Sequence, residues 1–348
     1  MDDAICELVD SIADFFARRR DAETIAEASA AGPVADRGRW TALCEMGLPV
    51  LRLPEPDGIG AGLLEATAVA EKIGAVLLPE PAIATIVLAE AWSAHQEATQ
   101  LLGELGTGSR IVALCGFDTV ELSRDGGVSG QVRVPDQGVT DAVALLARDQ
   151  DTAGAAIVIV DTASLPRPTR RLDVDPTRPV ALVTLHGTEP ADVLRLTGQS
   201  AARLRRELAL LTTAELVGGM QKVPTDTVAY AGAREQFGRP IGSFQAIKHR
   251  LADMFVATEQ ARAAVQFAAI ECSDGADAAA AAVASVARWV PRSAIDVFED
   301  AIHLHGAMGY SWEIDVHLHL RRAMATRAAL NGSEVVSFQW LSGDRQAV

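Results

Sequence analysis

Several features are scarce in this 348-residue chain, and each shortage excludes a class of protein. The four cysteines, Cys6, Cys44, Cys115 and Cys272, are widely spaced and form no C-x-x-C pair, so neither a disulfide framework nor a metal site is expected. No stretch reaches the roughly 18 uninterrupted apolar residues of a membrane span. The acidic start, Met1-Asp2-Asp3, lacks the basic region of a signal peptide. The sequence therefore predicts a cytoplasmic protein without a membrane-spanning segment.

Positive charge is also in short supply. The chain has 31 Lys and Arg against 46 Asp and Glu, a formal net charge of −15. Nucleic acids are bound by basic surfaces, so they are not expected as partners. A ligand phosphate could still bind to a local group of arginines, although solvated helix faces use Arg as readily. The groups are Arg203, Arg205 and Arg206; Arg167, Arg170 and Arg171; and Arg321 and Arg322.

Aromatic residues make up only 5% of the chain, and Ala-rich stretches such as Ala276 to Ala287 favour helices. Residues 1–110 show apolar residues at helical spacing, which predicts a helical N-terminal domain. Between 111 and 196 the pattern changes to short apolar runs bounded by Gly, Pro or Asp, which predict the strands of a small β domain. The runs are Ile111 to Leu114, Ala142 to Ala147, Ala155 to Val160 and Val180 to Leu185. Helical periodicity returns in 197–348. The predicted fold is therefore mainly α with a central, β-barrel-like domain.

The C-terminal part contains four helical segments, at about 200–232, 243–272, 276–305 and 313–330, and this number favours a four-helix bundle. Pro224 falls inside the first segment. A proline there removes one backbone donor and is expected to kink the helix.

Two blocks in this C-terminal part are specific. Arg234 to Asp253 reads R-E-Q-F-G-R-P-I-G-S-F-Q-A-I-K-H-R-L-A-D, and His303 to Tyr310 reads H-L-H-G-A-M-G-Y. The first resembles the signature of the acyl-CoA dehydrogenase family almost residue for residue, and the second resembles the family block Q-x-H-G-G-x-G-Y. The order of the three domains is also similar. The resemblance implies an FAD-dependent oxidoreductase that desaturates an acyl-CoA thioester between its α- and β-carbons.

The resemblance also implies which residues bind the cofactor. In the family, the Arg of the first block binds the FAD pyrophosphate of a neighbouring subunit, a role suited to the forked guanidinium of Arg234. Phe237 would pack near the adenine, Gln245 would hydrogen-bond the nucleotide, and Gly306 would allow close backbone approach. Composition alone would instead make Arg234 a helix-terminal cation and Phe237 a core residue. The implied cofactor-binding set is Arg234, Gln236, Phe237, Gln245, His303, Gly306 and Ala307.

Three departures from the family pattern concern the part of the site that holds the flavin ring and removes the α-proton. His303 and Ala307 replace the Gln and the second Gly of the second block. Gly116 to Glu121 stands where the family carries T-E-P and a G-S-D turn beside the flavin ring. Asn331 stands where the family usually places the Glu that removes the α-proton, and an amide cannot act as that base.

Some family members supply the base from the first helix of the bundle, where Glu207 is the nearest carboxylate. It is one residue out of register, about 100° around the helix. Glu207 is therefore the candidate catalytic residue, and Glu215, two turns further on, is a weaker one.

The leading hypothesis is a division of labour. This chain would be the less complete subunit of a heteromeric enzyme, resembling those of actinobacterial steroid and acyl-CoA degradation. A second acyl-CoA dehydrogenase-like subunit would carry the flavin ring and the base, in a dimer of dimers. Electron-transfer flavoprotein or a similar acceptor would reoxidise the flavin. The alternatives are a self-sufficient dehydrogenase using Glu207, a flavin monooxygenase on the same fold, and a flavin-free structural subunit.

Overall fold

The computed structural model describes residues 9–15, 35–94, 99–135, 138–152, 154–172, 174–273 and 278–333. Its N-terminal part is helical, as the sequence predicts. Residues 9–15 form a helix whose Val9 and Ile12 enter the main core, and Asp36 caps the next helix by accepting a 2.6 Å hydrogen bond from the Arg39 amide. The elements are α3 (Arg37–Glu45), η1 (Leu48–Val50), α4 (Leu63–Ala75), α5 (Ala82–Ser93) and α6 (Thr99–Thr107).

A mixed seven-stranded sheet follows, with the strand order β5-β6-β2-β1-β3-β4-β7. Its ends, β5 and β7, do not pair with each other, so the sheet is open, and the expected barrel-like closure is wrong. Only β1 and β3 run parallel. The strands are β1 (Val112–Leu122), β2 (Val128–Pro135), β3 (Ala142–Asp149), β4 (Ala155–Asp161), β5 (Arg170–Leu172), β6 (Val180–Thr188) and β7 (Asp192–Leu196), with η2 (Thr162–Ser164) after β4.

Both faces of the central strands are buried, which explains why they read as continuous apolar runs. Along β3, Ala142, Ala144 and Leu146 belong to the large core shared with the helices. The alternate residues Val143 and Leu145 belong to a second, smaller core between the strands. The sheet therefore separates two hydrophobic cores, and one of its faces packs toward the helices.

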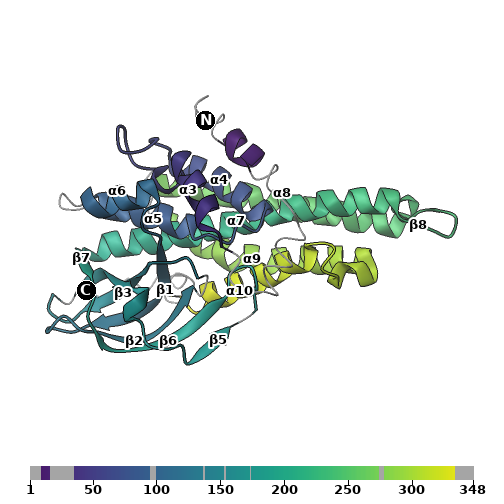
Figure 1. Ribbon diagram of the computed structural model, residues 1–348. Helices are drawn as coiled ribbons and strands as arrows, with labels where there is room; N and C mark the ends of the chain where they lie inside the picture. Colours follow the sequence, from purple (N-terminus) through teal and green to yellow (C-terminus); the bar gives the residue numbers. More distant parts are fainter. Residues whose placement is uncertain are drawn as a thin grey trace.

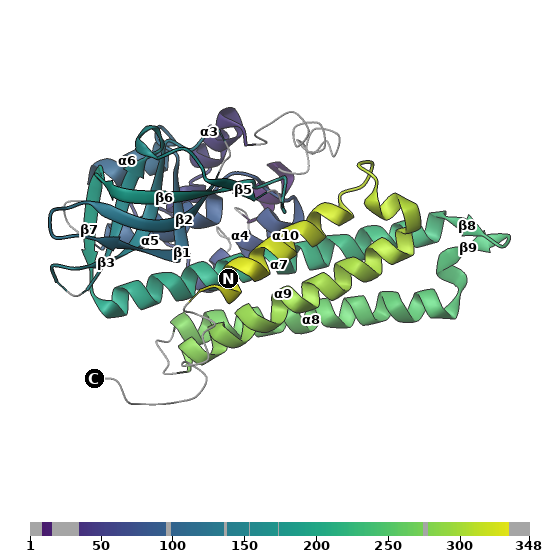
Figure 2. The same ribbon diagram turned by 90° about the horizontal axis from the view of Figure 1, so that it is seen from below.

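The described C-terminal residues, 197–273 and 278–333, contain four helices, which confirms the predicted segments to within a few residues. They lie side by side in Figure 2, and α7 continues through Pro224 as one helix. None of the helices in the described ranges is both long and apolar enough to cross a membrane. The elements are α7 (Gly198–Ala233), β8 (Glu235–Gln236), β9 (Arg239–Pro240), η3 (Ile241–Ser243), α8 (Gln245–Ser273), α9 (Ala279–His305), η4 (Gly306–Tyr310) and α10 (Val316–Asn331).

Helix α7 joins the three parts of the molecule. It crosses α4 so closely that a Cβ added at Gly218 would lie 1.8 Å from the Glu71 carbonyl oxygen. Beyond this crossing, α7 and α8 project away from the sheet and the N-terminal helices, and the β8-β9 hairpin stands at their far end (Figure 1). The signature motif is therefore at a projecting tip, away from the main core.

Candidate functional site

The hairpin at this tip is formed by the first residues of the first signature block, and the rest of the block leads into α8. Helix α7 ends at Ala233, and Arg234 turns the chain into the short strands β8 and β9. Phe237 has a positive φ of 55° and its side chain is 92% exposed, so it is not the core residue that composition alone suggests. Its one ring contact within the described residues is an edge-on approach to Phe244, with the ring centroids 6.1 Å apart. An exposed aromatic ring on a projecting hairpin is available to another molecule.

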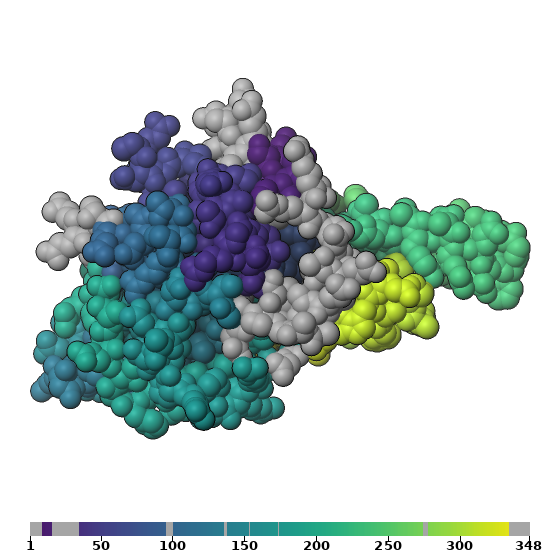
Figure 3. All heavy atoms as spheres, viewed as in Figure 1, coloured from purple at the N-terminus to yellow at the C-terminus, as the bar shows by residue number. Residues whose placement is uncertain are grey.

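The second block lies at the same end of the bundle, beside the base of the hairpin. The Tyr230 ring, in the last turn of α7, stacks on the His305 ring at 4.3 Å, and the Tyr230 hydroxyl donates to the His305 carbonyl at 3.4 Å. The chain then turns at Gly306, whose φ of 60° favours glycine. His303, Gly306 and Ala307 are exposed. The structure thus brings the two blocks together at one tip, which stands clear of the rest of the molecule in Figure 3.

The groups at this tip suit an anionic nucleotide. The Arg234 guanidinium is exposed and forms no ion pair with any residue in the described ranges. Ser243, between the hairpin and α8, has a buried Oγ atom without a hydrogen-bond partner in the same ranges. Gln236 and Gln245 are exposed as well. A free guanidinium, an unsatisfied hydroxyl and an amide are the donors that a pyrophosphate and an adenosine would require. The tip therefore fits half of an FAD site.

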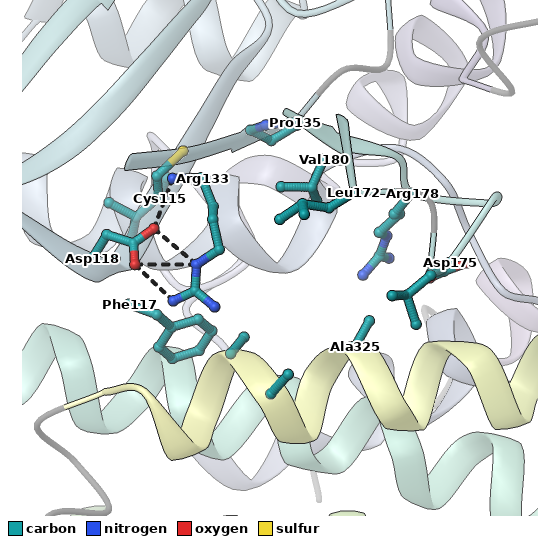
Figure 4. A pocket seen from close by; sticks show the side chains of 15 residues that line it. Cys115, Phe117, Asp118, Arg133, Pro135, Leu172, Asp175, Arg178, Val180 and Ala325 are labelled. Atoms are coloured by element: carbon teal, nitrogen blue, oxygen red, sulfur yellow. Dashed lines mark hydrogen bonds and ion pairs between the residues drawn. The ribbon is translucent and has the colours of Figure 1, made fainter. Parts of the chain in front are cut away.

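A second candidate site is a cavity between the sheet, α7 and α10. A bulge in β1 builds one of its walls, because Cys115 pairs with Leu145 while Thr119 pairs with the next residue of β3. Gly116, Phe117 and Asp118 are therefore displaced from the ladder and line the cavity. This bulge is the segment in which the sequence lacks the T-E-P and G-S-D elements. It places a phenyl ring and a carboxylate where α10 passes (Figure 4).

Arg133 on β2 neutralises the carboxylate of this bulge. Its Nη2 and Nε atoms lie 2.6 and 3.1 Å from Asp118 Oδ1, and its backbone amide donates to Oδ2 at 2.8 Å. A Cβ added at Gly332 would lie 3.7 Å from Arg133 Nη2, so the guanidinium lies beside the end of α10. Asn331, at that end, is exposed and does not line the cavity. A cation thus lies near the position where the family usually carries its base.

Four charged side chains, three of them buried and Arg178 half-buried, form another wall. Arg322 on α10 donates to Asp175, to Thr177 Oγ1 at 2.5 Å and to Glu215 Oε1 at 2.7 Å. Arg178 donates to Glu215 Oε2 at 2.9 Å and to the Leu78 carbonyl at 2.9 Å. These contacts tie the β5–β6 loop to α7, α10 and the N-terminal helices. The cluster consists of Asp175, Arg178, Glu215 and Arg322, two carboxylates and two guanidinium groups.

The charges in this cluster stabilise one another. Burial alone would raise the pKa of Asp175, but the Arg322 charge and the Thr177 hydroxyl outweigh it, and the pKa lies below its ordinary value. Burial similarly opposes the charged form of Arg322, yet Asp175 and Glu215 raise its pKa. The pKa of Arg178 is lowered, by burial and then by repulsion from Arg322. Asp175 therefore remains ionised, and both carboxylates of this wall are paired with arginines.

No described carboxylate that lines the cavity is free to act as a base. Asp118, Asp175 and Glu215 each contact at least one guanidinium. Glu207 lies elsewhere, with Oε2 2.5 Å from Arg52 Nη1 and Oε1 2.8 Å from Arg203 Nε, and it does not line the cavity. Two guanidinium groups occupy both oxygens of Glu207, so the geometry does not favour it as a proton acceptor.

Several of these residues have no signal in the sequence. Asp118, Arg133, Asp175 and Arg178 are in segments without a motif, and their partners are distant along the chain. Of the arginine groups considered for phosphate, Arg203 and Arg322 are engaged in internal ion pairs. No group of three or more metal-binding side chains occurs in the described ranges. The sequence motifs therefore indicated the residues of the tip but not the charged residues that line the cavity.

Comparisons with known proteins agree with both motifs. The sequence profile of the acyl-CoA dehydrogenase C-terminal domain matches residues 203–338. Acyl-CoA dehydrogenase IpdE2 of Mycobacterium tuberculosis is 31% identical over 333 residues, which cover 94% of this chain and 93% of that protein. The fold resembles the ChsE4-ChsE5 complex from Mycobacterium tuberculosis, with a TM-score of 0.83, 26% identity and coverage of 95% and 94%. A variant of the Tcur3481-Tcur3483 steroid ACAD also gives a TM-score of 0.83, at 24% identity and coverage of 94% and 93%.

Proposed function

This chain belongs to the acyl-CoA dehydrogenase family of oxidoreductases, which act on CH–CH groups, and from that premise we propose that it is the less complete subunit of a heteromeric, FAD-dependent enzyme. The substrate is an acyl-CoA thioester. The partner is a second dehydrogenase-like subunit that contributes the catalytic carboxylate. Electron-transfer flavoprotein or a similar protein accepts the electrons. When bound, FAD supplies the two-electron acceptor for α,β-desaturation.

The observation that carries this proposal is the contrast between the tip and the cavity. At the tip, Arg234 and Phe237 are exposed on a projecting hairpin, where they cannot close around a cofactor bound in the same chain's cavity. In the cavity, every described lining carboxylate is paired with an arginine, and Asn331 replaces the usual base. The chain thus retains the groups that reach toward a neighbour, while the described lining of its cavity offers no free carboxylate for proton abstraction.

The tip residues have distinct tasks in such an assembly. Arg234 would hold the pyrophosphate by two charge-assisted hydrogen bonds, and the Phe237 ring would cover the adenine. Gln245 and Ser243 would hydrogen-bond the nucleotide, and Gln236 lies in the same hairpin. His303, Gly306 and Ala307 would approach it through the neighbouring turn, where Gly306 allows the backbone to come close. None of these tasks requires a base on this chain.

A two-chain assembly has support from a relative. The ChsE4-ChsE5 complex contains two different chains, and this chain shares its fold over nearly its whole length. A self-sufficient enzyme that uses Glu207 is the main alternative, but Arg52 and Arg203 already bind that carboxylate.

Flavin content under two conditions tests the proposal. The chain is purified alone and after co-expression with a second acyl-CoA dehydrogenase-like protein, and flavin absorbance per chain is measured. We expect flavin only in the co-expressed complex, which bleaches on anaerobic addition of an acyl-CoA. A chain that retains flavin and bleaches by itself would establish the self-sufficient alternative. Reduction by NADH would indicate a monooxygenase, and no flavin under either condition would leave a structural subunit.

A further inference from the structure

Asn331, the last residue of α10, is the only asparagine in the 348-residue chain, and a glycine follows it. An asparagine loses its side-chain amide most readily when glycine comes next, because glycine has no side chain to hinder attack by its own backbone nitrogen. Asn331 is not among the residues that line the cavity. The chemistry of this amide does not depend on the shared flavin site proposed above.

The local structure leaves the reacting groups accessible. Asn331 is exposed, and Gly332 follows it where the helix ends. The Gly332 amide is shared between the carbonyls of Ala328 and Leu330, and its distance to the Ala328 oxygen is 3.3 Å, longer than the usual value of about 2.9 Å. Weak bonds of a last helical turn open readily. Opening frees the Gly332 nitrogen and lets Asn331 leave the helical conformation.

A cation lies close to this peptide bond. A Cβ added at Gly332 would lie 3.7 Å from Arg133 Nη2. Positive charge stabilises the negative charge that develops when a backbone nitrogen loses its proton and attacks a carbonyl carbon. It also stabilises the carboxylate that results, which the negative end of the α10 dipole disfavours. Arg133 is thus placed to favour both the reaction and its product.

We propose that Asn331 is a site of spontaneous deamidation, which converts the end of α10 from an amide to a carboxylate. The Gly332 nitrogen bonds to Asn331 Cγ, and the side-chain nitrogen leaves as ammonia, so that a cyclic imide, a succinimide, forms. The proton of the Gly332 amide passes through solvent to the departing ammonia. Water then adds to either imide carbonyl and breaks its bond to nitrogen, which gives aspartate or isoaspartate. The net reaction consumes water and releases ammonia, and no oxidant or reductant takes part.

Deamidation gives the chain a second form that differs at the end of α10. Aspartate at position 331 restores a carboxylate where the resemblance places the family's base. Isoaspartate instead adds a methylene group to the backbone, which alters the last turn of the helix. Either product adds a negative charge near Arg133 at neutral pH.

Peptide mapping of the full chain by mass spectrometry, after incubation in mildly alkaline buffer, tests this site. The tryptic peptide that follows Arg327 contains Asn331, and its mass changes when an NH2 group is replaced by OH. We expect the folded chain to lose the amide at a rate within about thirtyfold of that in the same chain unfolded in urea, because the last turn opens readily. Aspartate and isoaspartate should both form, and in heavy-oxygen water each new carboxylate should carry a labelled oxygen.

Gly332→Ala removes the feature on which the reaction depends and keeps the fold. Its Cβ would meet no atom closer than 3.6 Å, and the Gly332 φ of −81° suits alanine. The methyl group hinders attack by the nitrogen, so the amide should be lost at least about tenfold more slowly. Gly103→Ala in α6 is the matched control and should leave the rate unchanged. Equal rates in these two variants, both shown to be folded by thermal unfolding, would overturn the proposal, as would slower loss from the folded chain than the expected range.

Discussion

Arg322 is the residue on which the buried charge cluster depends most. It bonds to Asp175, Thr177 and Glu215, and only 5% of its side chain is exposed. Replacing it with methionine would leave Asp175 without an arginine partner and weaken the neutralisation of Glu215. Breaking a buried pair in this way costs about 3–5 kcal/mol.

We therefore expect Arg322→Met to lower the free energy of unfolding by about 3–5 kcal/mol in urea denaturation. Arg292→Met, at an exposed position of α9, is the matched control and should change it by less than about 0.5 kcal/mol. Equal stability of the two variants would mean that the cluster contributes nothing to folding.

Asp175 makes part of this stability dependent on pH. Its pKa is lower in the folded protein than in the unfolded chain, so its contribution is present above the unfolded pKa of about 3.9 and is lost as the pH falls through the folded value. We expect the chain to be more stable than Asp175→Asn at neutral pH, and the difference to shrink below about pH 4. Unfolding free energies at several pH values measure it. A difference that grows toward acid would contradict the assignment.

At the scale of the elements, the crossing of α4 and α7 depends on glycine. A Cβ at Gly218 would lie 1.8 Å from a backbone oxygen of α4, which cannot move without shifting the helix. Gly218→Ala should therefore destabilise the protein by several kcal/mol, roughly in the range of overpacked cores or above. Gly103→Ala in α6 meets no atom within 4 Å and should instead stabilise it by up to about 1 kcal/mol. Thermal unfolding of both variants measures this contrast.

The same junction contains a buried acid. Burial raises the pKa of Glu71 on α4, although the Gln221 amide, 2.9 Å from Oε2, opposes the shift. A raised folded pKa means that stability is present below the unfolded pKa and is lost as the pH rises through the folded value. Glu71→Gln should therefore unfold at a higher temperature than the unchanged chain at neutral pH and at a similar one in acid. Lower stability of the variant at neutral pH would show that the charge is needed.

The sequence predicts an element well when its apolar residues recur at a regular spacing or form a continuous run. The bundle helices and the apolar strands β3 and β4 were predicted almost at their observed ends, because both kinds have a strong periodic or continuous signal. Strand β2 was missed because it alternates buried and exposed residues instead of forming an apolar run. The tip motif is a continuous run of residues, so it could be recognised in the sequence. The Asp118–Arg133 pair depends on a bulge and on the pairing of β1 with β2, and the sequence pattern reveals neither.

At the scale of the whole molecule, the tip and the cavity are two separate sites with different groups. The tip presents outward the groups that we propose to bind the cofactor, and the cavity, enclosed by the sheet and α10, has no described carboxylate free of an arginine. A single chain cannot bring its own tip to its own cavity, because α7 and α8 extend away from the sheet. The proposed function therefore requires a neighbour that receives the tip, and the departures at Asn331 and Gly116 to Glu121 are the reason to propose that this neighbour is a different chain.

The most direct test of this account is the flavin content of the two-chain complex after Arg234→Ala. The variant should still assemble with its partner, because the guanidinium forms no ion pair within the described chain, but flavin per complex should fall at least about tenfold with the loss of a charge-assisted pair. Arg124→Ala, in the turn between β1 and β2, removes an equally exposed arginine from the sheet and should leave flavin content unchanged. Full flavin content in an intact Arg234→Ala complex would contradict the shared site.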